Sequence, residues 1–202
     1  MNCLQLNLSG YHGTCSKFRT SIESNGLDPN KVKFRSDHWL GQGVYYFEDY
    51  SQAMWWASDT ASKSYNAGSY ALIYKSIIEA DCNEVLNLDN NSEMDNFFSC
   101  ILKDIAEIEK DSRNRVPLFT PEKFRAVYFD YYKIQNNISV IIYTFPKDAV
   151  RYASNRTWDE LKKQRELAKS LGMYYGEKQI CVSKKDCIKS SEMVYNEEEE
   201  VI

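Results

Sequence analysis

The chain has 202 residues, a formal net charge of −4, and apolar, aromatic and charged fractions of 43%, 14% and 27%. This length favours one domain with a substantial core, and the composition excludes wholesale disorder. The acidic balance excludes a global basic field that attracts nucleic acid, so any such contact requires a local basic patch.

The six cysteines are scattered without Cys-x-x-Cys spacing, and the chain has two histidines. This pattern predicts no metal site, and it predicts that Cys100 and Cys181 are small apolar core residues. The N-terminus lacks the basic and apolar regions of a signal peptide, and no apolar run reaches the roughly eighteen residues of a membrane span. We therefore expect a cytoplasmic protein without a membrane segment.

The first predicted elements are two helices that flank a short aromatic strand. The first helix covers residues 16–25 and ends at Gly26, because glycine is typical of the position after a helix. A polar loop follows over residues 27–38. The second helix begins after the aromatic strand, with Ser51 as its N-cap.

The middle of the chain alternates between strand and helix patterns. Residues 70–80 are rich in Tyr, Leu and Ile and predict a strand, and a shorter strand follows near residues 84–88. Apolar residues at helical spacing predict a third helix that Ser92 opens. Residues 123–132 are ambiguous between helix and strand, whereas residues 138–145 predict a strand that the following proline stops.

The last predicted elements are a helix and a strand. Thr157 and Glu160 have the spacing of a capping box, which predicts a helix that ends at Gly172. Residues 178–183 predict a last short strand.

The irregular order of these elements lacks the βαβ rhythm of a parallel sheet and predicts an α+β fold. No repeat or Pro/Gly/Ser-rich linker divides the chain, so we expect a single domain over residues 1–190. Residues 191–202 include a run of glutamates and predict a solvated acidic tail. The alternative is that this run binds a basic partner.

Two motifs specify a site rather than only a fold. Tyr-His-Gly-Thr over residues 11–14 ends the first short strand, and Gly-Gln-Gly-Val-Tyr over residues 41–45 turns into the aromatic strand. Glycine lets the backbone approach a flat ligand closely, and aromatic rings provide faces for stacking. This pattern resembles the nicotinamide pocket of the ADP-ribosyltransferase superfamily, particularly its diphtheria-toxin-like and poly(ADP-ribose)-polymerase-like branch. The resemblance implies a split β-sheet with flanking helices, in which residues 1–190 are the catalytic domain.

The resemblance also implies that the protein takes NAD as a substrate and cleaves its bond between nicotinamide and ribose. His12 matches the histidine that hydrogen-bonds the adenosine-side ribose, and Gly13, with Thr14 beside it, matches the residue whose backbone holds the carboxamide. Tyr45 matches the tyrosine that stacks on the nicotinamide. Trp56 matches a second aromatic residue that closes this clamp, and each stack contributes about 1 kcal/mol.

The polar loop matches the variable donor loop that covers NAD in the family. Lys33 or Arg35 in this loop carries the charge to meet the pyrophosphate. His38, at the end of the loop, joins the predicted NAD-binding residues. The alternative is that His38 and Trp39 only cap the loop.

The late strand departs from the family pattern, because Gln179 stands where the family has a catalytic glutamate. An amide can hydrogen-bond a ribose 2′-hydroxyl, but it cannot accept a proton or stabilise positive charge as a carboxylate does. The departure argues against polymer synthesis and for the transfer of one ADP-ribose. Glu177 lies on the same strand face, and by analogy with the toxin branches it addresses the acceptor nucleophile.

Structural roles stay open for some of these residues. Gln179 is alternatively a buried glutamine satisfied by its neighbours, and Trp56 alternatively packs its helix against the sheet. Neighbouring strand residues point to opposite faces, so only one of Tyr45 and Tyr46 lines the pocket, and we expect this to be Tyr45.

The sequence therefore predicts an NAD-dependent mono-ADP-ribosyltransferase that, by analogy, is a toxin or an antiphage-defence effector. Its expected acceptor is a nucleic acid, with RNA preferred, or a protein. An NAD glycohydrolase and a non-catalytic module that binds NAD or ADP-ribose are the alternatives. The same analogy implies an antitoxin or inhibitor protein as a partner.

Overall fold

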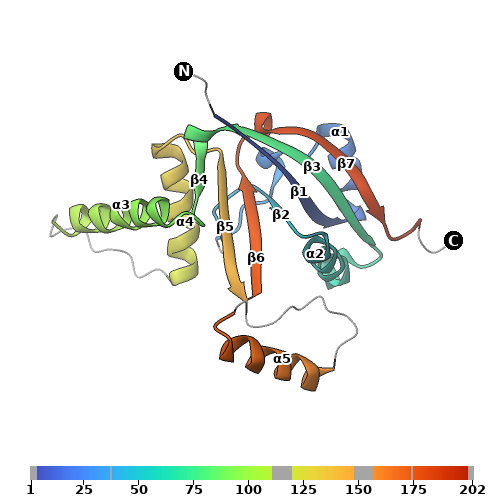
Figure 1. Cartoon of the computed structure of the whole chain (residues 1–202). Helices are drawn as coiled ribbons and strands as arrows, with labels where there is room; N and C mark the ends of the chain where they lie inside the picture. Colours follow the sequence, from blue (N-terminus) through green and yellow to red (C-terminus); the bar gives the residue numbers. More distant parts are fainter. Residues whose placement is uncertain (1–3, 37, 111–119, 148–156, 174, 200–202) are drawn as a thin grey trace.

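The computed structural model describes residues 4–36, 38–110, 120–147, 157–173 and 175–199. These residues form one domain around a seven-stranded sheet with helices on both faces (Figure 1). The strand order is β4-β5-β6-β2-β1-β3-β7, and only the β4–β5 pairing is parallel among these neighbours. This mixed architecture confirms the predicted α+β class.

The central strands β2, β3 and β5 are runs rich in β-branched and aromatic residues, which fit a pleated, half-buried surface. The strands of the sheet are β1 (Gln5–Cys15), β2 (Val44–Phe47), β3 (Ala71–Asp81), β4 (Val85–Asn87), β5 (Val140–Lys147), β6 (Tyr175–Val182) and β7 (Ile188–Asn196).

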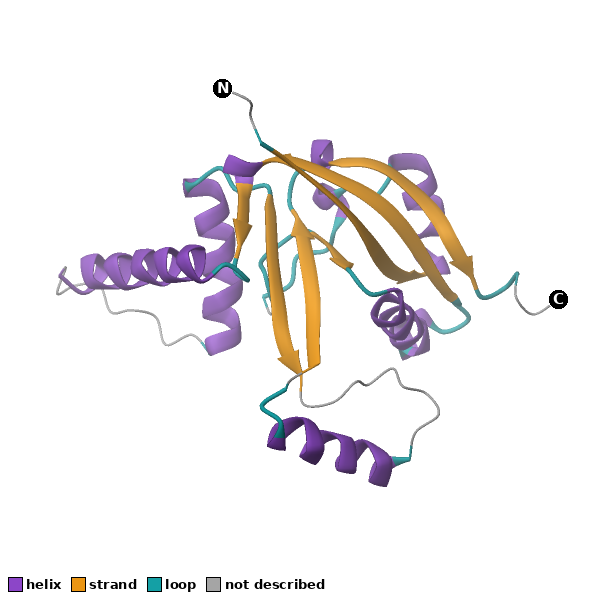
Figure 2. Ribbon diagram, in the orientation of Figure 1, coloured by secondary structure: helices purple, strands orange, loops and turns teal. Residues whose placement is uncertain are grey.

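The described residues form five α-helices, which Figure 2 shows around the sheet. They are α1 (Arg19–Asn25), α2 (Tyr50–Ser62), α3 (Asn91–Lys110), α4 (Pro121–Gln135) and α5 (Trp158–Ser170). Short 3-10 turns, such as η2 (Pro29–Lys31) and η5 (Lys185–Cys187), complete the connections.

The core divides between the two faces of the sheet, because side chains alternate along each strand. On one face, Tyr46 and Ile180 pack with Tyr74, Leu27 and Ile22, and we call this the α1 face. On the other face, which we call the α2/α4 face, two clusters lie side by side. One joins α4 and α3 to β5 and β6, and the other joins α2 to β1 and β3.

The sheet is weakest between β1 and β2. These strands share one register pair, Tyr11 with Phe47, whereas β1 and β3 are paired along their whole length. β2 in turn pairs with β6 through all of its residues. The sheet therefore consists of two blocks, β4-β5-β6-β2 and β1-β3-β7, and Figure 1 shows β5 and β6 running in a different direction from β1, β3 and β7.

Several local signals act as the sequence predicts. α1 ends at Gly26, which has a φ of 70°, and Gly172 follows α5 with a φ of 66°. Thr157 caps α5 and forms the complete capping box with Glu160. These positions confirm the predicted helix ends, because a positive φ favours glycine and a capping box satisfies the first amides of a helix.

Other boundaries differ from the predictions. Asp49, not Ser51, is the N-cap of α2, since its carboxylate accepts the Ser51 amide at 2.8 Å. The ambiguous residues 123–132 lie inside α4, because the Thr120 side chain caps that helix. β5 continues through Pro146, since a proline close to a strand end removes only one ladder hydrogen bond.

The predicted acidic tail is wrong over residues 191–196, which belong to β7 and pair with β3. This strand is mostly exposed and polar, so its composition resembles that of a tail. The glutamate run begins attached to the sheet: the Glu197 carboxylate accepts the Ala71 amide at 2.7 Å, and the Glu197 amide donates to the Ala71 carbonyl at 3.2 Å. Residues 200–202 lie outside the described residues.

Candidate functional site

The backbone of Gly13 faces the junction between the two blocks. The Ser16 amide donates to the Tyr70 carbonyl at 2.9 Å, so the even-numbered residues at this end of β1 bond toward β3. In an antiparallel ladder the backbone groups of successive residues alternate in direction. The N–H and C=O of Gly13 therefore point toward β2.

The backbone groups of β2 also alternate in direction. The Glu48 amide donates to the Lys178 carbonyl at 3.4 Å, so even-numbered residues bond toward β6 and the carbonyl of Tyr45 points toward β1. Gly13 and Tyr45 would form the next hydrogen-bonded pair after Tyr11 and Phe47, but the register of β1 and β2 contains no such pair. The ladder stops one step before the two motifs would join.

The His12 side chain bonds the Tyr45 carbonyl, which the missing pair of Gly13 and Tyr45 leaves without a strand partner. Its Nδ1 lies 2.8 Å from the Tyr45 carbonyl oxygen, and a carbonyl only accepts, so Nδ1 carries the proton. Burial lowers the pKa of His12, and the hydrogen bond to Tyr45 opposes this shift only in part. The imidazole is therefore neutral at pH 7, and its Nε2 is an acceptor for a hydroxyl group.

Acidification is expected to destabilise the protein through His12. Its pKa in the folded state lies below the ordinary 6.5, so between the two values the unfolded chain binds a proton that the folded chain does not. The contribution of His12 to stability is complete above 6.5 and decreases as the pH falls toward the folded pKa. Urea unfolding between about pH 7.5 and about pH 5.5 measures it, and His12→Gln should flatten this dependence. An unchanged slope would contradict the assignment.

Gly13 also has a packing role, on the side of the strand that faces α2. A Cβ atom built on Gly13 would lie 2.1 Å from the Ala53 carbonyl oxygen and 3.0 Å from the Ala57 amide nitrogen. Both neighbours are backbone atoms of α2. The absence of a side chain therefore lets the helix lie directly on β1, independently of any ligand.

Tyr45 is held by both ends. Its backbone carbonyl accepts from His12, while its hydroxyl accepts the Leu40 amide and donates to the Gly41 carbonyl, each at 2.7 Å. Burial raises the pKa of Tyr45, so the hydroxyl stays protonated. The ring packs on the α2/α4 face, whereas Tyr46 is fully buried on the α1 face, as the alternation predicts.

Gln179 and Glu177 form a polar pair on β6. Gln179 is 7% exposed, and its Nε2 donates to Glu177 Oε1 at 2.6 Å, which leaves the amide oxygen to accept a further donor. Lys147 Nζ lies 3.5 Å from the same Glu177 oxygen. Gln179 pairs with Phe47 across β6 and β2, so this polar pair lies one strand away from the junction, on the α2/α4 face.

The aromatic residues around the junction have their own neighbours. Trp56 is 40% exposed, and its ring lies 6.3 Å from that of Phe47. The ring of His38 lies 5.5 Å from that of Tyr45, and His38 is almost buried. Phe47 thus stands on the same face as Tyr45, beside Trp56, and the clamp of Tyr45 and Trp56 around a ligand stays a prediction.

The remaining predicted residues lie farther from this group. Thr14 is buried and pairs with Leu72 of β3, so its side chain is on the same face as that of His12. Arg35 is exposed in the segment after η2. The structure therefore brings together His12, Gly13 and Tyr45 at the junction, with Gln179 and Glu177 on the neighbouring strand.

A buried charged group that the sequence reasoning missed holds the Gly-Gln-Gly turn. The Asp130 carboxylate accepts the Gln42 amide at 2.6 Å, and Lys133 Nζ donates to the Gln42 carbonyl at 2.7 Å. Lys133 is 7% exposed and lies 3.3 Å from Asp130 and 3.7 Å from Cys181, which is fully buried as predicted. Two charged residues within the aromatic run of α4 were the available signal.

A second missed group surrounds Trp39. The Arg125 guanidinium and the Lys147 ammonium lie 4.9 Å and 4.7 Å from the centre of the Trp39 ring, and the Phe145 ring packs edge-on at 4.6 Å. Cation–π contacts of this kind are worth about 0.5–1 kcal/mol at exposed sites. Lys147 therefore links Trp39 to the polar pair of Glu177 and Gln179.

No protein-family model, curated protein or solved structure matches this chain. Among the residues whose placement is described, no helix is long and apolar enough to cross a membrane.

Proposed function

We propose that the junction of β1 and β2 binds NAD, and that the protein is an enzyme that cleaves the bond between nicotinamide and ribose. The observation that carries this proposal is the missing pair of Gly13 and Tyr45. In its place stand a neutral His12 with a free acceptor nitrogen and a Gly13 backbone turned toward the junction. A ribose hydroxyl complements the first, and a carboxamide, with one donor and one acceptor side, complements the second.

Within this class, we assign the protein as a mono-ADP-ribosyltransferase with the split sheet of that superfamily. The two blocks joined at one residue pair support the split sheet. Gln179 orients the nicotinamide-side ribose through its free amide oxygen, while Glu177 holds the amide nitrogen. An amide does not supply the charge stabilisation of a carboxylate, which favours one transfer over chain synthesis.

The proposed binding mode follows the positions of the side chains. His12 projects from the α1 face, whereas Tyr45, Gln179 and Glu177 belong to the α2/α4 face. The dinucleotide would therefore lie across the junction, with its adenosine side at His12 and its nicotinamide at Tyr45. The carbon–nitrogen bond breaks with its electron pair leaving on nicotinamide, and the acceptor nucleophile bonds to the ribose carbon and gives up its proton to the Glu177 carboxylate.

The acceptor is assigned to the α2/α4 face. Lys147 and Arg125 beside Trp39 form a small cationic and aromatic patch next to Glu177, which suits RNA or another nucleic acid more than a basic protein segment. The roles as a toxin or defence effector, and the neutralising protein partner, are based on the family resemblance alone.

Incubation of the protein with adenosine-labelled NAD and separate RNA, DNA and protein fractions tests this proposal. Label in one macromolecular fraction, with release of nicotinamide, is the expected result. His12→Ala and Gln179→Ala should each slow nicotinamide release roughly tenfold, the scale of one hydrogen bond. Lys178→Ala is the matched control. Lys178 lies between Glu177 and Gln179 on β6, but its ammonium group pairs with the Glu48 carboxylate at 3.0 Å.

The alternatives give different results in the same experiment. Free ADP-ribose without labelled macromolecule would identify an NAD glycohydrolase, for which Gln179 only orients the ribose. Calorimetric binding of NAD without nicotinamide release would identify a non-catalytic module. Absence of NAD binding would overturn the assignment of the junction.

A further inference from the structure

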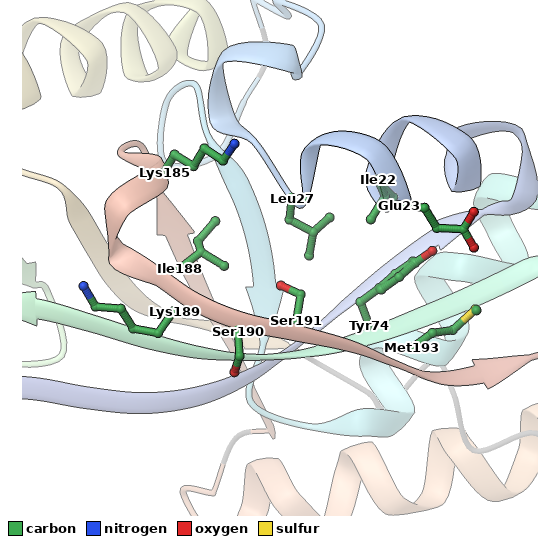
Figure 3. A pocket seen from close by; sticks show the side chains of 11 residues that line it. Ile22, Glu23, Leu27, Tyr74, Lys185, Ile188, Lys189, Ser190, Ser191 and Met193 are labelled. Atoms are coloured by element: carbon green, nitrogen blue, oxygen red, sulfur yellow. The ribbon is translucent and has the colours of Figure 1, made fainter.

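A cavity of about 420 Å³ lies between α1 and β7, on the α1 face (Figure 3). Ile22 and Leu27 form the wall on the α1 side, and Tyr74 of β3 with Ser191 and Met193 of β7 form the opposite wall. Small-molecule sites occupy about 300–1,000 Å³, so the cavity has the size of a binding site. It lies on the opposite face of the sheet from Gln179 and Glu177.

The hydroxyl of Tyr74 is the first feature that points to a ligand. Tyr74 is 4% exposed, and among the described residues its hydroxyl has no hydrogen-bond partner. Leaving a buried donor unsatisfied costs about 1–3 kcal/mol. Figure 3 shows the ring along the cavity wall with its hydroxyl near Glu23. Burial, with the charge of Glu23, raises the pKa of Tyr74, so the hydroxyl keeps its proton at neutral pH and can donate it in a hydrogen bond.

The second feature is the division of the cavity into an apolar part and a cationic end. The side chains of Ile22, Leu27, Ile188 and Met193 provide the apolar part, and these four positions come from both walls. Figure 3 shows Lys185 and Lys189 at the end of the cavity away from Tyr74.

The two lysines are held near this end without strong neutralisation. Lys185 Nζ lies 3.9 Å from an Asp28 carboxylate oxygen, at the limit of an ion pair, and Lys189 Nζ donates to the Asp186 carbonyl at 2.8 Å. Figure 3 shows the two ammonium groups pointing away from each other, so an anionic group at this end would meet one of them and gain a charge-assisted hydrogen bond, which is about twice as strong as a neutral one. The cavity therefore complements a molecule that is apolar in the middle and anionic at one end.

We propose that this cavity binds a small amphipathic anion, in which a ring-sized apolar body carries one phosphate or carboxylate. The body lies between Leu27 and Met193, the anionic group meets Lys185 or Lys189, and Tyr74 donates to an oxygen of the ligand. The site borders the junction, since Tyr74 pairs with His12 across β3 and β1 and both side chains are on the α1 face. This inference stands independently of NAD chemistry.

Calorimetric titration of the full chain with uridine 5′-monophosphate and with 3-phenylpropionate tests the site, and uridine is the control without an anionic group. At least one of the two anions is expected to bind with a Kd below about 1 mM, and uridine at least tenfold more weakly. Binding of the phosphate alone identifies a nucleotide-type ligand, and binding of the carboxylate alone identifies an organic acid. Failure of both anions to bind would overturn the proposal.

Variants locate the binding. Tyr74→Phe keeps the ring and should weaken the bound anion about three- to tenfold without lowering the melting temperature, because the hydroxyl it removes has no protein partner. The double variant Lys185→Ala and Lys189→Ala should weaken it about tenfold or more. Lys178→Ala should leave it unchanged. Binding that ignores both cavity variants would assign the anion to another site.

Discussion

Replacement of Gly13 by alanine is expected to lower the free energy of unfolding by about 3 kcal/mol, at the upper end of overpacking substitutions. The added Cβ would stand 2.1 Å from the Ala53 carbonyl oxygen and 3.0 Å from the Ala57 amide nitrogen. Backbone atoms in the middle of a helix cannot rotate aside as a side chain does, so α2 must move away from β1. Urea denaturation followed by circular dichroism measures the loss.

Gly172→Ala is the matched control for this prediction. Gly172 has a φ of 66°, but a Cβ there would meet nothing within 4 Å, and the Met173 amide donates to the Ala168 carbonyl as in a Schellman helix end. The cost of the left-handed conformation alone is about 1 kcal/mol. Equal losses in the two variants would contradict the packing role of Gly13. A stable Gly13→Ala protein that no longer binds NAD would assign the glycine to the ligand instead.

Replacement of Lys133 by alanine is expected to cost about 2 kcal/mol, the scale of a hydrogen bond from a charged group. Lys133 is 7% exposed and donates to the Gln42 carbonyl at 2.7 Å, while the Asp130 side chain, which is 31% exposed, would lose its cation. The turn over residues 41–43 would also lose one of the two side-chain contacts that it makes with α4 at Gln42. Thermal and urea unfolding measure the stability, and nicotinamide release measures the effect on the junction.

Lys63→Ala is the control for this variant. Lys63 also forms an ion pair within its neighbourhood, with Asp59 at 3.0 Å, but the two side chains are 44% and 32% exposed. Exposed pairs of this kind contribute about 0.5 kcal/mol or less. If Lys133→Ala lowered the free energy of unfolding as little as Lys63→Ala, the buried Lys133 would not be what holds the turn.

Local patterns in the sequence predicted much of the fold. Gly26 and the pair of Thr157 and Glu160 mark helix ends, because capping depends on residues within one turn. β7 could not be predicted, since its stability comes from pairing with β3 rather than from its own polar residues. The aromatic residues of α4 suit both helix and strand, and only the Thr120 cap and the packing against α3 select the helix.

The sequence likewise predicted one part of the candidate site and not the other. The motifs over residues 11–14 and 41–45 predicted that His12, Gly13 and Tyr45 meet, and the structure places them at one junction. The tautomer of His12 depends on where the ladder of β1 and β2 stops, which no local pattern encodes. Lys133 and Trp39 act through partners from distant segments, so their roles are visible only in three dimensions.

A sheet whose two blocks share a single register pair has a mechanical consequence. Directional backbone bonds fix the alignment within each block, whereas among the described residues Tyr11 with Phe47 is the one register pair between the blocks, and the hydrogen bond of His12 to the Tyr45 carbonyl lies beside it. Much of the remaining contact there is between apolar side chains and is non-directional. Such contacts tolerate sliding and rotation, so the blocks can pivot about this seam without breaking either ladder. A ligand bound at this seam would contact both blocks and restrict their relative motion. The stiffness of the whole sheet would then depend on whether the ligand is bound.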